Sequence, residues 1–169
     1  MPEFNVVTEG ELRPVLDRLL GMQWPIPIAE IPHVIDSLGW TPLGRWAAWS
    51  TLPVSSNIVS FTGLKDEVGS VMLRLSDTLP DESPASKKIV LGAFPGAKQM
   101  VSSYLGFEPT MPRPWGMFGY SWELPDGRRI DLLDGNNTII LDIWSKRNAD
   151  IERNEIRLGI DPSVEPERM

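Results

Sequence analysis

Three stretches near the C-terminal end of the chain alternate between apolar and polar residues. They are "GMFGYSWEL" at 116–124, "RRIDLL" at 128–133 and "TIILDIW" at 138–144. A period of two is typical of β-strands. The polar sequences between the stretches, "PDG" and "DGNN", favour tight turns. Together these patterns predict an antiparallel meander of three strands.

The phase of the alternation assigns side chains to the two faces of this meander. Trp122 shares the apolar phase and is expected in the core, whereas Trp144 is expected on the second face, partly covered by a helix. Asp131 is opposite in phase to Ile130 and Leu132, so we expect it to face water. We therefore interpret the aspartates of this region as turn and surface residues, not as an acidic active site.

The remainder of the chain predicts four helices and a second group of strands. Thr8 and Glu11 form a capping-box pattern before the first helix, whose regular part is expected to begin near Arg13 because Pro14 lacks a backbone donor. The other expected elements are a helix at 29–40, strands between 45 and 77, a helix from Ser83 to about Leu105, and a helix at 148–159 capped by Asn148.

Strands that follow one another, with helices clustered between them, favour one α+β domain over residues 1–169. We expect an antiparallel sheet of about six strands that includes the C-terminal meander. Two short N-terminal helices, one central helix kinked at Pro95 and one short C-terminal helix accompany it. Residues 1–7 and 160–169 are expected to be loose, because chain ends are ordered only where they are tied down.

A predicted hairpin carries the most prominent charged loop. The β-type runs at 57–61 and 70–76 flank "TGLKDEVG", which we interpret as a long, solvated tip. This tip contains Lys65, Asp66, Glu67 and a flexible Gly69.

Charge and composition limit the classes of partner. The 169 residues carry a formal net charge of -7, which disfavours nucleic-acid phosphates and favours basic partners. No apolar run approaches the roughly 20 residues that cross a bilayer, so we expect no membrane partner. Because the chain has no cysteine and no basic region followed by an apolar stretch at its start, we expect no signal peptide and a cytoplasmic location.

The chain lacks the side chains that most metal and catalytic sites require. His33 is the single histidine and there is no cysteine, which nearly excludes a zinc site. No G-x-S-x-G turn accompanies His33, which we interpret as a half-buried or surface helix residue. No phosphate-binding glycine loop occurs, and the spacing of "DLLDGNN" does not match a calcium loop. We therefore predict no metal, no cofactor and no enzymatic activity.

Trp115 ends the proline-rich loop "EPTMPRPWG" at 108–116. An aromatic side chain on a stiff loop is a good interface anchor, because little conformational entropy is lost on binding. A tryptophan in a loop also often folds back as a lid on its own core. The sequence leaves both roles open for Trp115.

Three stretches resemble a family of small actinobacterial proteins of the toxin-immunity type. They are "SLGW" at 37–40, "SWELPDGRRIDLL" at 121–133 and "ADIERNEIRLGIDP" at 149–162, and chain length and element order agree with them. The overall size and element order also resemble those of the type of immunity factor that neutralises the tuberculosis necrotizing toxin, a secreted NAD glycohydrolase. The resemblance spans roughly residues 8–162.

The resemblance implies a cytoplasmic immunity protein, or antitoxin, that binds a folded toxin domain one to one and occludes its active site. An enzyme that binds NAD presents cations to the pyrophosphate, and an acidic loop would compete for them. A toxin domain with a basic cleft is therefore the expected partner. The candidate partner-binding residues are Lys65, Asp66, Glu67, Gly69 and Trp115.

Two other functions are compatible with the sequence. A chaperone or adaptor for a secretion-system substrate also fits a small acidic α+β protein, and it would hold an unfolded or helical export segment. A small hydrolase or lyase that uses only carboxylates would need at least two acids converging in a buried cleft. The acids considered for that role are Asp66, Glu123 and Asp131.

Overall fold

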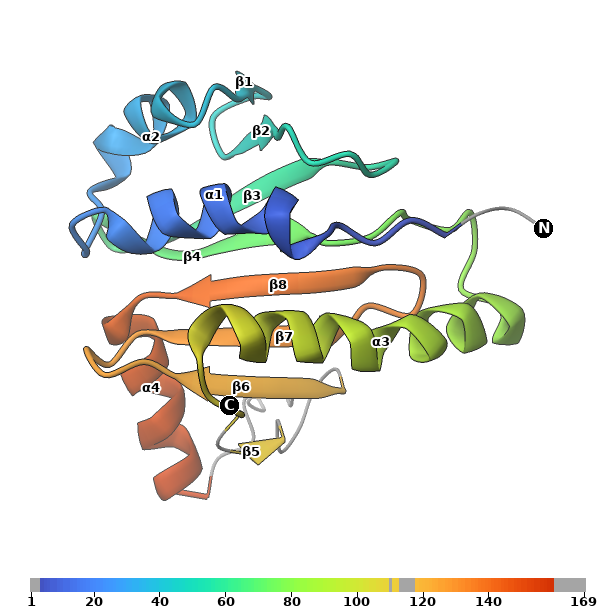
Figure 1. Ribbon diagram of the computed structural model, residues 1–169. Helices are drawn as coiled ribbons and strands as arrows, with labels where there is room; N and C mark the ends of the chain where they lie inside the picture. Colours follow the sequence, from blue (N-terminus) through green and yellow to red (C-terminus); the bar gives the residue numbers. More distant parts are fainter. Residues whose placement is uncertain (1–3, 110, 113–117, 160–169) are drawn as a thin grey trace, which may run out of the picture.

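The computed structural model describes residues 4–109, 111–112 and 118–159, which form an antiparallel sheet with four α-helices (Figure 1). The strand order is β1-β2-β3-β4-β8-β7-β6-β5. The strands are β1 (Thr41–Pro42), β2 (Ala47–Trp49), β3 (Ile58–Leu64), β4 (Glu67–Arg74), β5 (Met111–Pro112), β6 (Gly119–Glu123), β7 (Arg129–Asp134) and β8 (Ile139–Trp144). The first four strands therefore form one half of the sheet and the last four form the other.

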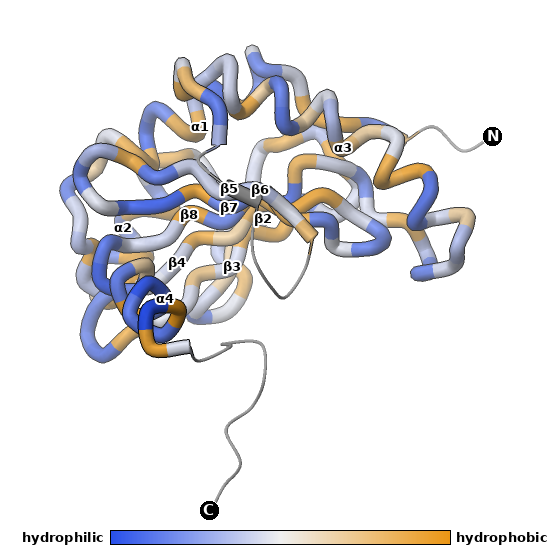
Figure 2. The backbone as a smooth tube through the Cα atoms, turned by 90° about the horizontal axis from the view of Figure 1, so that it is seen from below, coloured by the Kyte–Doolittle hydropathy of each residue, from blue (hydrophilic) through white to orange (hydrophobic). Residues whose placement is uncertain are grey.

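Helices lie on both faces of the sheet. They are α1 (Glu9–Gly21), α2 (Ile31–Ser37), α3 (Pro84–Leu105) and α4 (Lys146–Arg157), and the 3₁₀ turn η1 (Ile28–Glu30) precedes α2. Helices α1 and α3 lie side by side on one face, and α4 lies on the other (Figures 1 and 2). Helix α2 contacts the edge strand β1.

The main core lies between the sheet and the layer formed by α1 and α3. The strand register places Val71, Ile143 and Ile130 side by side across β4, β8 and β7. These three side chains, together with Leu16 of α1 and Val90 of α3, are 0% exposed. Burial of each such side chain contributes about 1.5–3 kcal/mol. The period-two alternation of the strands therefore supplies the apolar face that this helix layer covers.

The predicted α+β fold and the C-terminal meander are confirmed. Strands β6, β7 and β8 pair in sequence order, and Trp122 is fully buried. Thr8 caps α1 and forms the predicted capping box with Glu11. Ser83 caps α3, which runs through Pro95 without a break.

Two helix starts differ from the prediction. Helix α1 begins at Glu9 and not near Arg13, because a well-capped helix tolerates the one missing donor at Pro14. The N-cap of helix α4 lies three residues before the expected cap, Asn148. Its N-cap is Ser145, whose Oγ accepts a hydrogen bond from the backbone N–H of Asn148.

The predicted long tip between β3 and β4 is wrong. Strand β3 continues to Leu64 and β4 begins at Glu67, so the turn consists of Lys65 and Asp66 alone. A register shift leaves Gly69 as the extra residue of a β-bulge in β4. Because Gly69 is accommodated as an unpaired bulge residue, the rest of the stretch at 62–69, apart from the turn itself, pairs across the hairpin and does not form a long loop.

Asp131 does not face water but is 0% exposed. It lies on the second face of the sheet, as its phase predicts, opposite Asp142 of β8. That face is covered here by α4, and alternation alone does not reveal whether a second face is solvated or covered. Trp144, predicted on the same face, is half-buried beneath the guanidinium of Arg129, which lies 4.2 Å from its ring centre.

The expectation of a loose N-terminus is wrong for residues 4–7. Val6 forms an antiparallel bridge with Ser76, and the Val7 N–H donates to the Leu75 carbonyl (2.8 Å). The other residues expected to be loose, 1–3 and 160–169, lie outside the described residues. Within the described part of the chain, no helix is long and apolar enough to cross a membrane.

Candidate functional site

Four segments from distant parts of the chain meet at one end of the sheet. They are the loop at 22–30, the β3–β4 turn, the β6–β7 turn and the first turns of α4. We call the loop at 22–30 the N-terminal loop and the whole region the hairpin end. Two hollows open there, one on each side of the N-terminal loop.

Backbone hydrogen bonds fix the β3–β4 turn against the N-terminal loop. The Ile28 N–H donates to the Asp66 carbonyl (3.0 Å), and the Val68 N–H donates to the Ile26 carbonyl (2.8 Å). The side chains of Lys65 and Asp66 remain exposed at the turn. The charged side chains of Lys65 and Asp66 therefore lie on a turn whose backbone is fixed by hydrogen bonds to the N-terminal loop.

Lys65 adopts a left-handed backbone conformation with a φ of 60°. This conformation costs a residue other than glycine about 1–2 kcal/mol. Tight hairpin turns usually place glycine or asparagine at such positions. A lysine held in this conformation at an exposed turn is a candidate contact residue, because backbone strain is concentrated at functional sites.

Arg128, in the β6–β7 turn, connects the meander to the N-terminal loop. Its Nε and Nη2 atoms contact Asp126 (2.8 and 2.6 Å), and its Nη1 atom donates to the Leu20 carbonyl (2.9 Å). The guanidinium also lies 5.6 Å from the ring centre of Trp24, whose Nε1 donates to the Leu19 carbonyl (2.8 Å). The hydrogen bond from Arg128 lowers the pKa of Asp126 below its ordinary value. These contacts hold the Trp24 ring in a fixed position.

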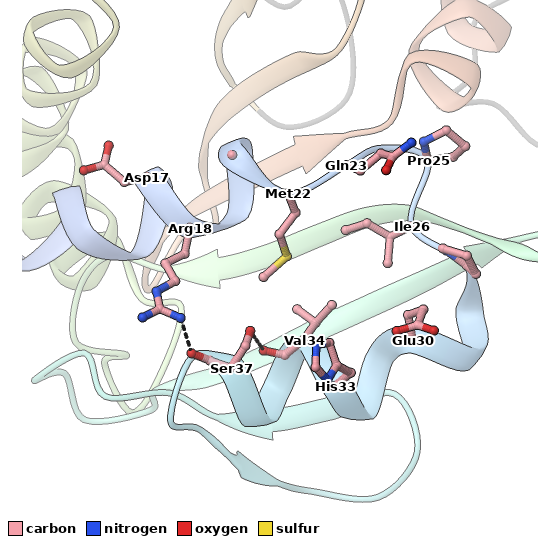
Figure 3. A pocket seen from close by; sticks show the side chains of 12 residues that line it. Asp17, Arg18, Met22, Gln23, Pro25, Ile26, Glu30, His33, Val34 and Ser37 are labelled. Atoms are coloured by element: carbon pink, nitrogen blue, oxygen red, sulfur yellow. Dashed lines mark hydrogen bonds between the residues drawn. The ribbon is translucent and has the colours of Figure 1, made fainter.

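The first hollow is a groove of about 850 Å³ between α1 and α2 (Figure 3). Its apolar lining includes the buried side chains of Ile26 and Val34, and His33 lies on its α2 wall. Arg18 closes one end of the groove by donating to the Ser37 carbonyl (2.7 Å). A groove of this volume lies within the range that is typical of ligand pockets.

The second hollow, of about 550 Å³, lies between the N-terminal loop and α4. We call it the α4 hollow. Its apolar lining consists of Trp24, Pro25 and Ile151, and Pro25 also lines the groove. The ion pairs around it are Asp126–Arg128 (2.6 Å), Lys146–Asp150 (2.6 Å) and Glu67–Arg147 (3.8 Å). An apolar hollow surrounded by polar groups is the usual anatomy of an interface anchor site.

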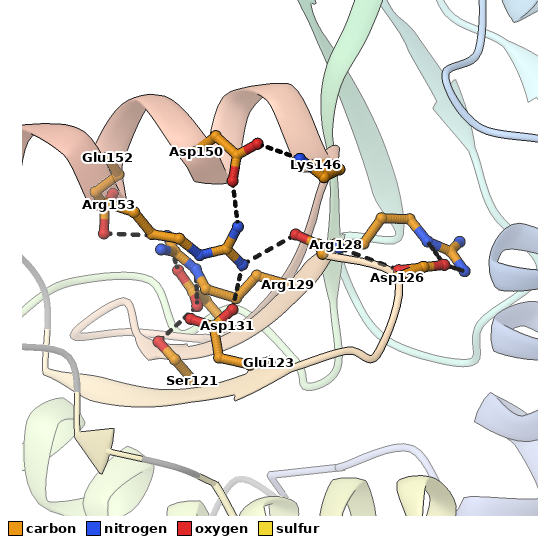
Figure 4. Close-up of polar contacts among 11 residues, drawn as sticks. Ser121, Glu123, Asp126, Arg128, Arg129, Asp131, Lys146, Asp150, Glu152 and Arg153 are labelled. Carbon is orange, nitrogen blue, oxygen red and sulfur yellow. Dashed lines mark hydrogen bonds and ion pairs between the residues drawn. The ribbon is translucent and has the colours of Figure 1, made fainter.

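A buried charged network attaches α4 to the second face of the sheet (Figure 4). Arg129 is 3% exposed and pairs with Asp131 (3.0 Å) and with Glu152 of α4 (3.1 Å). Closer to the surface, Arg153 of α4 pairs with Glu123 of β6. Buried charges of this kind are stable only when they are paired, so the network fixes α4 in one position on the sheet.

The predicted partner-binding residues differ in accessibility. Lys65 and Asp66 are exposed, and Glu67 is half-buried at the wall of the α4 hollow. Gly69 is buried within β4, so it shapes the strand and is not accessible to a partner in this conformation. Trp115 lies outside the described residues.

The described residues contain no group of three or more histidine or acidic side chains placed to hold a metal ion. His33 is exposed on α2, which confirms its interpretation as a surface helix residue. Asp66 is exposed at the β3–β4 turn, whereas Asp131 is sealed beneath α4. Neither the groove nor the α4 hollow is lined by Glu123 or Asp131, so the three acids considered for a hydrolase do not meet in either of them.

The sequence patterns predicted neither the contact of Arg128 with the Leu20 carbonyl nor the exposed apolar residues of α4. Arg128 and the Leu20 carbonyl that it binds are 108 residues apart, and no local pattern signals such a contact. Ile151 and Leu158 do have a signal, because a spacing of seven places both on one face of a helix.

These observations define an α+β protein with a rigid composite surface at one end of an antiparallel sheet. The chain belongs to DUF6301, a family of unknown function whose profile matches residues 10–145. The matched part ends at Ser145, the N-cap of α4, so α4 itself lies beyond it. The searches of curated proteins and of solved structures found no match.

Proposed function

We propose that this protein is a non-enzymatic protein-binding factor, most concretely a cytoplasmic immunity protein. In this proposal it binds a folded toxin domain with a basic cleft, such as an NAD glycohydrolase, in a one-to-one complex. The observation that carries the proposal is the exposed Lys65–Asp66 turn, which is fixed by backbone hydrogen bonds beside two hollows.

The rigidity of the hairpin end supports this proposal. A protein that occludes an active site needs a projection that enters the cleft and a surrounding surface that meets its rim. A turn that is already ordered loses little conformational entropy on binding. The strained backbone of Lys65 is consistent with a side chain that is kept for contact and not for stability.

Charge also supports the proposal. The net charge of -7 attracts a basic domain over long range and accelerates encounter. At the turn itself, Asp66 makes no ion pair with any other described residue, so its carboxylate is available to a cation of the partner. Lys65 beside it offers a second, oppositely charged contact, which favours one orientation of the partner.

The decisive experiment pairs this protein with the product of an adjacent toxin-like gene. Copurification and protection of the host cell are measured for the wild type, for Asp66→Lys and for Glu82→Lys. Both variants change the net charge equally. Glu82 is exposed beyond the opposite end of β4, which makes it a matched control.

We expect Asp66→Lys to weaken the complex by about tenfold or more and Glu82→Lys to change it by less than about twofold. Equal effects of the two variants would show that only net charge matters and that the hairpin end is not the binding site. If no adjacent gene product binds the protein or is toxic in its absence, the proposed function is wrong.

A chaperone or adaptor for a secretion-system substrate is the second candidate. It is favoured by exposed apolar side chains on α4, where Ile151 is 41% and Leu158 is 68% exposed. The conformation of the bound protein distinguishes the two candidates. An immunity protein holds a folded and active-site-competent domain, whereas a chaperone holds an unfolded or helical export segment. Limited proteolysis of the purified complex measures this difference.

A further inference from the structure

Helix α4 buries a charged residue, Glu152, beside Ala149 and leaves the apolar residues Ile151, Ile156 and Leu158 exposed. A surface helix normally buries its apolar stripe and exposes its charges. In α4 the buried residues are Ala149 and Glu152, while Ile151 and Leu158, its C-cap, are 41% and 68% exposed. Figure 2 shows this helix on the face opposite α1 and α3.

Charged side chains attach helix α4 to the sheet. The helix is attached through Glu152, which pairs with Arg129, and through Arg153, which pairs with Glu123 and donates to the Gly127 carbonyl (Figure 4). Apolar residues that a helix leaves in water without need add no stability and increase the risk of aggregation. Single exposed apolar residues are common on protein surfaces, but Ile151 lies beside an apolar hollow, which makes it a candidate contact residue.

Two of the exposed apolar residues, Ile151 and Leu158, lie on the face of α4 that forms a wall of the α4 hollow. Arg147, Ile151, Asn154 and Leu158 are spaced by three or four residues and so share one face of the helix. Three of the four, all except Leu158, line the α4 hollow. The opposite wall is formed by Trp24, whose ring is held by its own hydrogen bond and by Arg128.

The charges at this surface specify the chemistry of the occupant. Arg147 is 43% exposed and lies 3.8 Å from Glu67, so its ion pair is loose and its guanidinium can accept a second carboxylate. Lys146 beside it is 64% exposed but already pairs with Asp150 (2.6 Å), so Arg147 is the cation offered to the occupant. An apolar side chain with a carboxylate on its flank would fill the hollow and pair with Arg147.

We propose that the α4 hollow and the exposed face of α4 form a docking surface for such a side chain, and that this surface determines which toxin is recognised. This inference rests on the proposed function. Glu67, which follows the Lys65–Asp66 turn, and Ile151 of α4 line the same hollow, so a partner that reaches the turn also meets α4. The hairpin turn would occlude the partner, and α4 would select it.

The docking chemistry is tested on the isolated, full-length protein with 8-anilino-1-naphthalenesulfonate. This probe combines an aromatic body with one anionic group. Fluorescence titration is carried out on the wild type, Ile151→Ser, Arg147→Gln and the matched control Leu91→Ser. Leu91 lies on α3 and is 50% exposed, and Ile151 is 41% exposed, so neither serine variant removes a core residue. Circular dichroism checks that all variants are folded.

We expect one saturable site, weakened about fivefold or more by Ile151→Ser and about threefold by Arg147→Gln, with Leu91→Ser near the wild type. The inference is overturned if no saturable site exists, if Leu91→Ser acts as strongly as Ile151→Ser, or if Arg147→Gln has no effect. Analytical ultracentrifugation tests whether a second copy of this protein, and not a toxin, occupies the α4 hollow. Self-association that Ile151→Ser abolishes would also overturn the inference.

The same variants separate this inference from the proposed function. If Asp66→Lys disrupts the toxin complex while Ile151→Ser changes neither the complex nor probe binding, the docking surface is wrong and the immunity function stands. If the probe binds as expected but no adjacent toxin is bound, the proposed function is wrong, and with it the assignment of this surface to toxin selection. Loss of both the complex and probe binding in Ile151→Ser supports both.

Discussion

Three aspartates of this protein have the same side chain and three different environments. Asp131 is sealed beneath α4 with Arg129, Asp126 is half solvated in an ion pair with Arg128, and Asp66 is exposed at the β3–β4 turn. The carboxylates of Asp131 and Asp126 already form ion pairs within the fold, and that of Asp131 is also buried. Of the three, only Asp66 is available to a partner, which is why the functional test is placed there.

At the same residue scale, the ion pair of Asp126 predicts a pH-dependent stability. Its pKa in the folded protein is lowered chiefly by the Arg128 hydrogen bond, so the pair stabilises the fold above the unfolded-state pKa of about 3.9. This contribution is lost as the pH falls through the lowered folded-state value. Asp126→Asn retains the side-chain acceptor of the turn but removes the charge.

We expect Asp126→Asn to lower the free energy of unfolding by a few tenths of a kcal/mol, at most about 1 kcal/mol, near neutral pH, because the Asp126 side chain is 52% exposed and solvent screens the pair. The difference from the wild type should shrink towards zero at an acidic pH below the lowered folded-state pKa of Asp126. Urea denaturation at both pH values measures it, with Glu82→Gln as the exposed control. A difference that is the same at both pH values would contradict the assignment.

At the scale of elements, α4 depends on charge for its attachment. Glu152→Ala removes its buried contact with Arg129, and we expect the free energy of unfolding to fall by about 1–3 kcal/mol. Amide hydrogen exchange should accelerate throughout α4 and remain slow in β7 and β8. Glu155→Ala, on a half-exposed residue of the same helix, is the control. Unchanged exchange in α4 after Glu152→Ala would show that the helix is held in another way.

Local signals were sufficient to predict most elements of this fold. Period-two alternation placed β6, β7 and β8, and side-chain caps at Thr8 and Ser83 marked two helix starts. These local signals did not predict that a helix covers the second face of the sheet, on which Asp131 lies. Helix α4 covers Asp131 by presenting Glu152 to the sheet, and a charged residue in a helix is normally interpreted as solvent-facing.

The candidate site was less predictable than the elements because it is assembled from distant segments. The charged residues Lys65 and Asp66 were recognised, but the β-bulge at Gly69 that shortens their turn has no reliable local signature. The contact from Arg128 to the Leu20 carbonyl depends on the completed sheet. A local pattern can therefore nominate the exposed charges, but the hollows beside them require the tertiary structure.

At the scale of the whole molecule, the N-terminal segment is tied to the centre of the sheet. Val7 is 3% exposed and donates its N–H to the Leu75 carbonyl, and the Leu75 N–H donates to the Ile139 carbonyl. We expect Val7→Ala to lower the free energy of unfolding by about 1.5–2.5 kcal/mol through lost burial and the cavity that remains. Val6→Ala, at the half-buried neighbour, should cost less than half as much. Urea denaturation distinguishes the two, and equal costs would contradict the burial assigned to Val7.

The strand order has a consequence for how the chain is made. Among the described residues, strands β1 to β4 and β5 to β8 form two halves that share the ladder of β4 with β8, and β8 is synthesised after the other seven. A ribosome that adds about 5–20 residues per second leaves β4 with one open edge for several seconds. An apolar strand with an open edge pairs readily with other chains. The nascent first half is therefore exposed to aggregation until β8 emerges and closes the sheet at its centre.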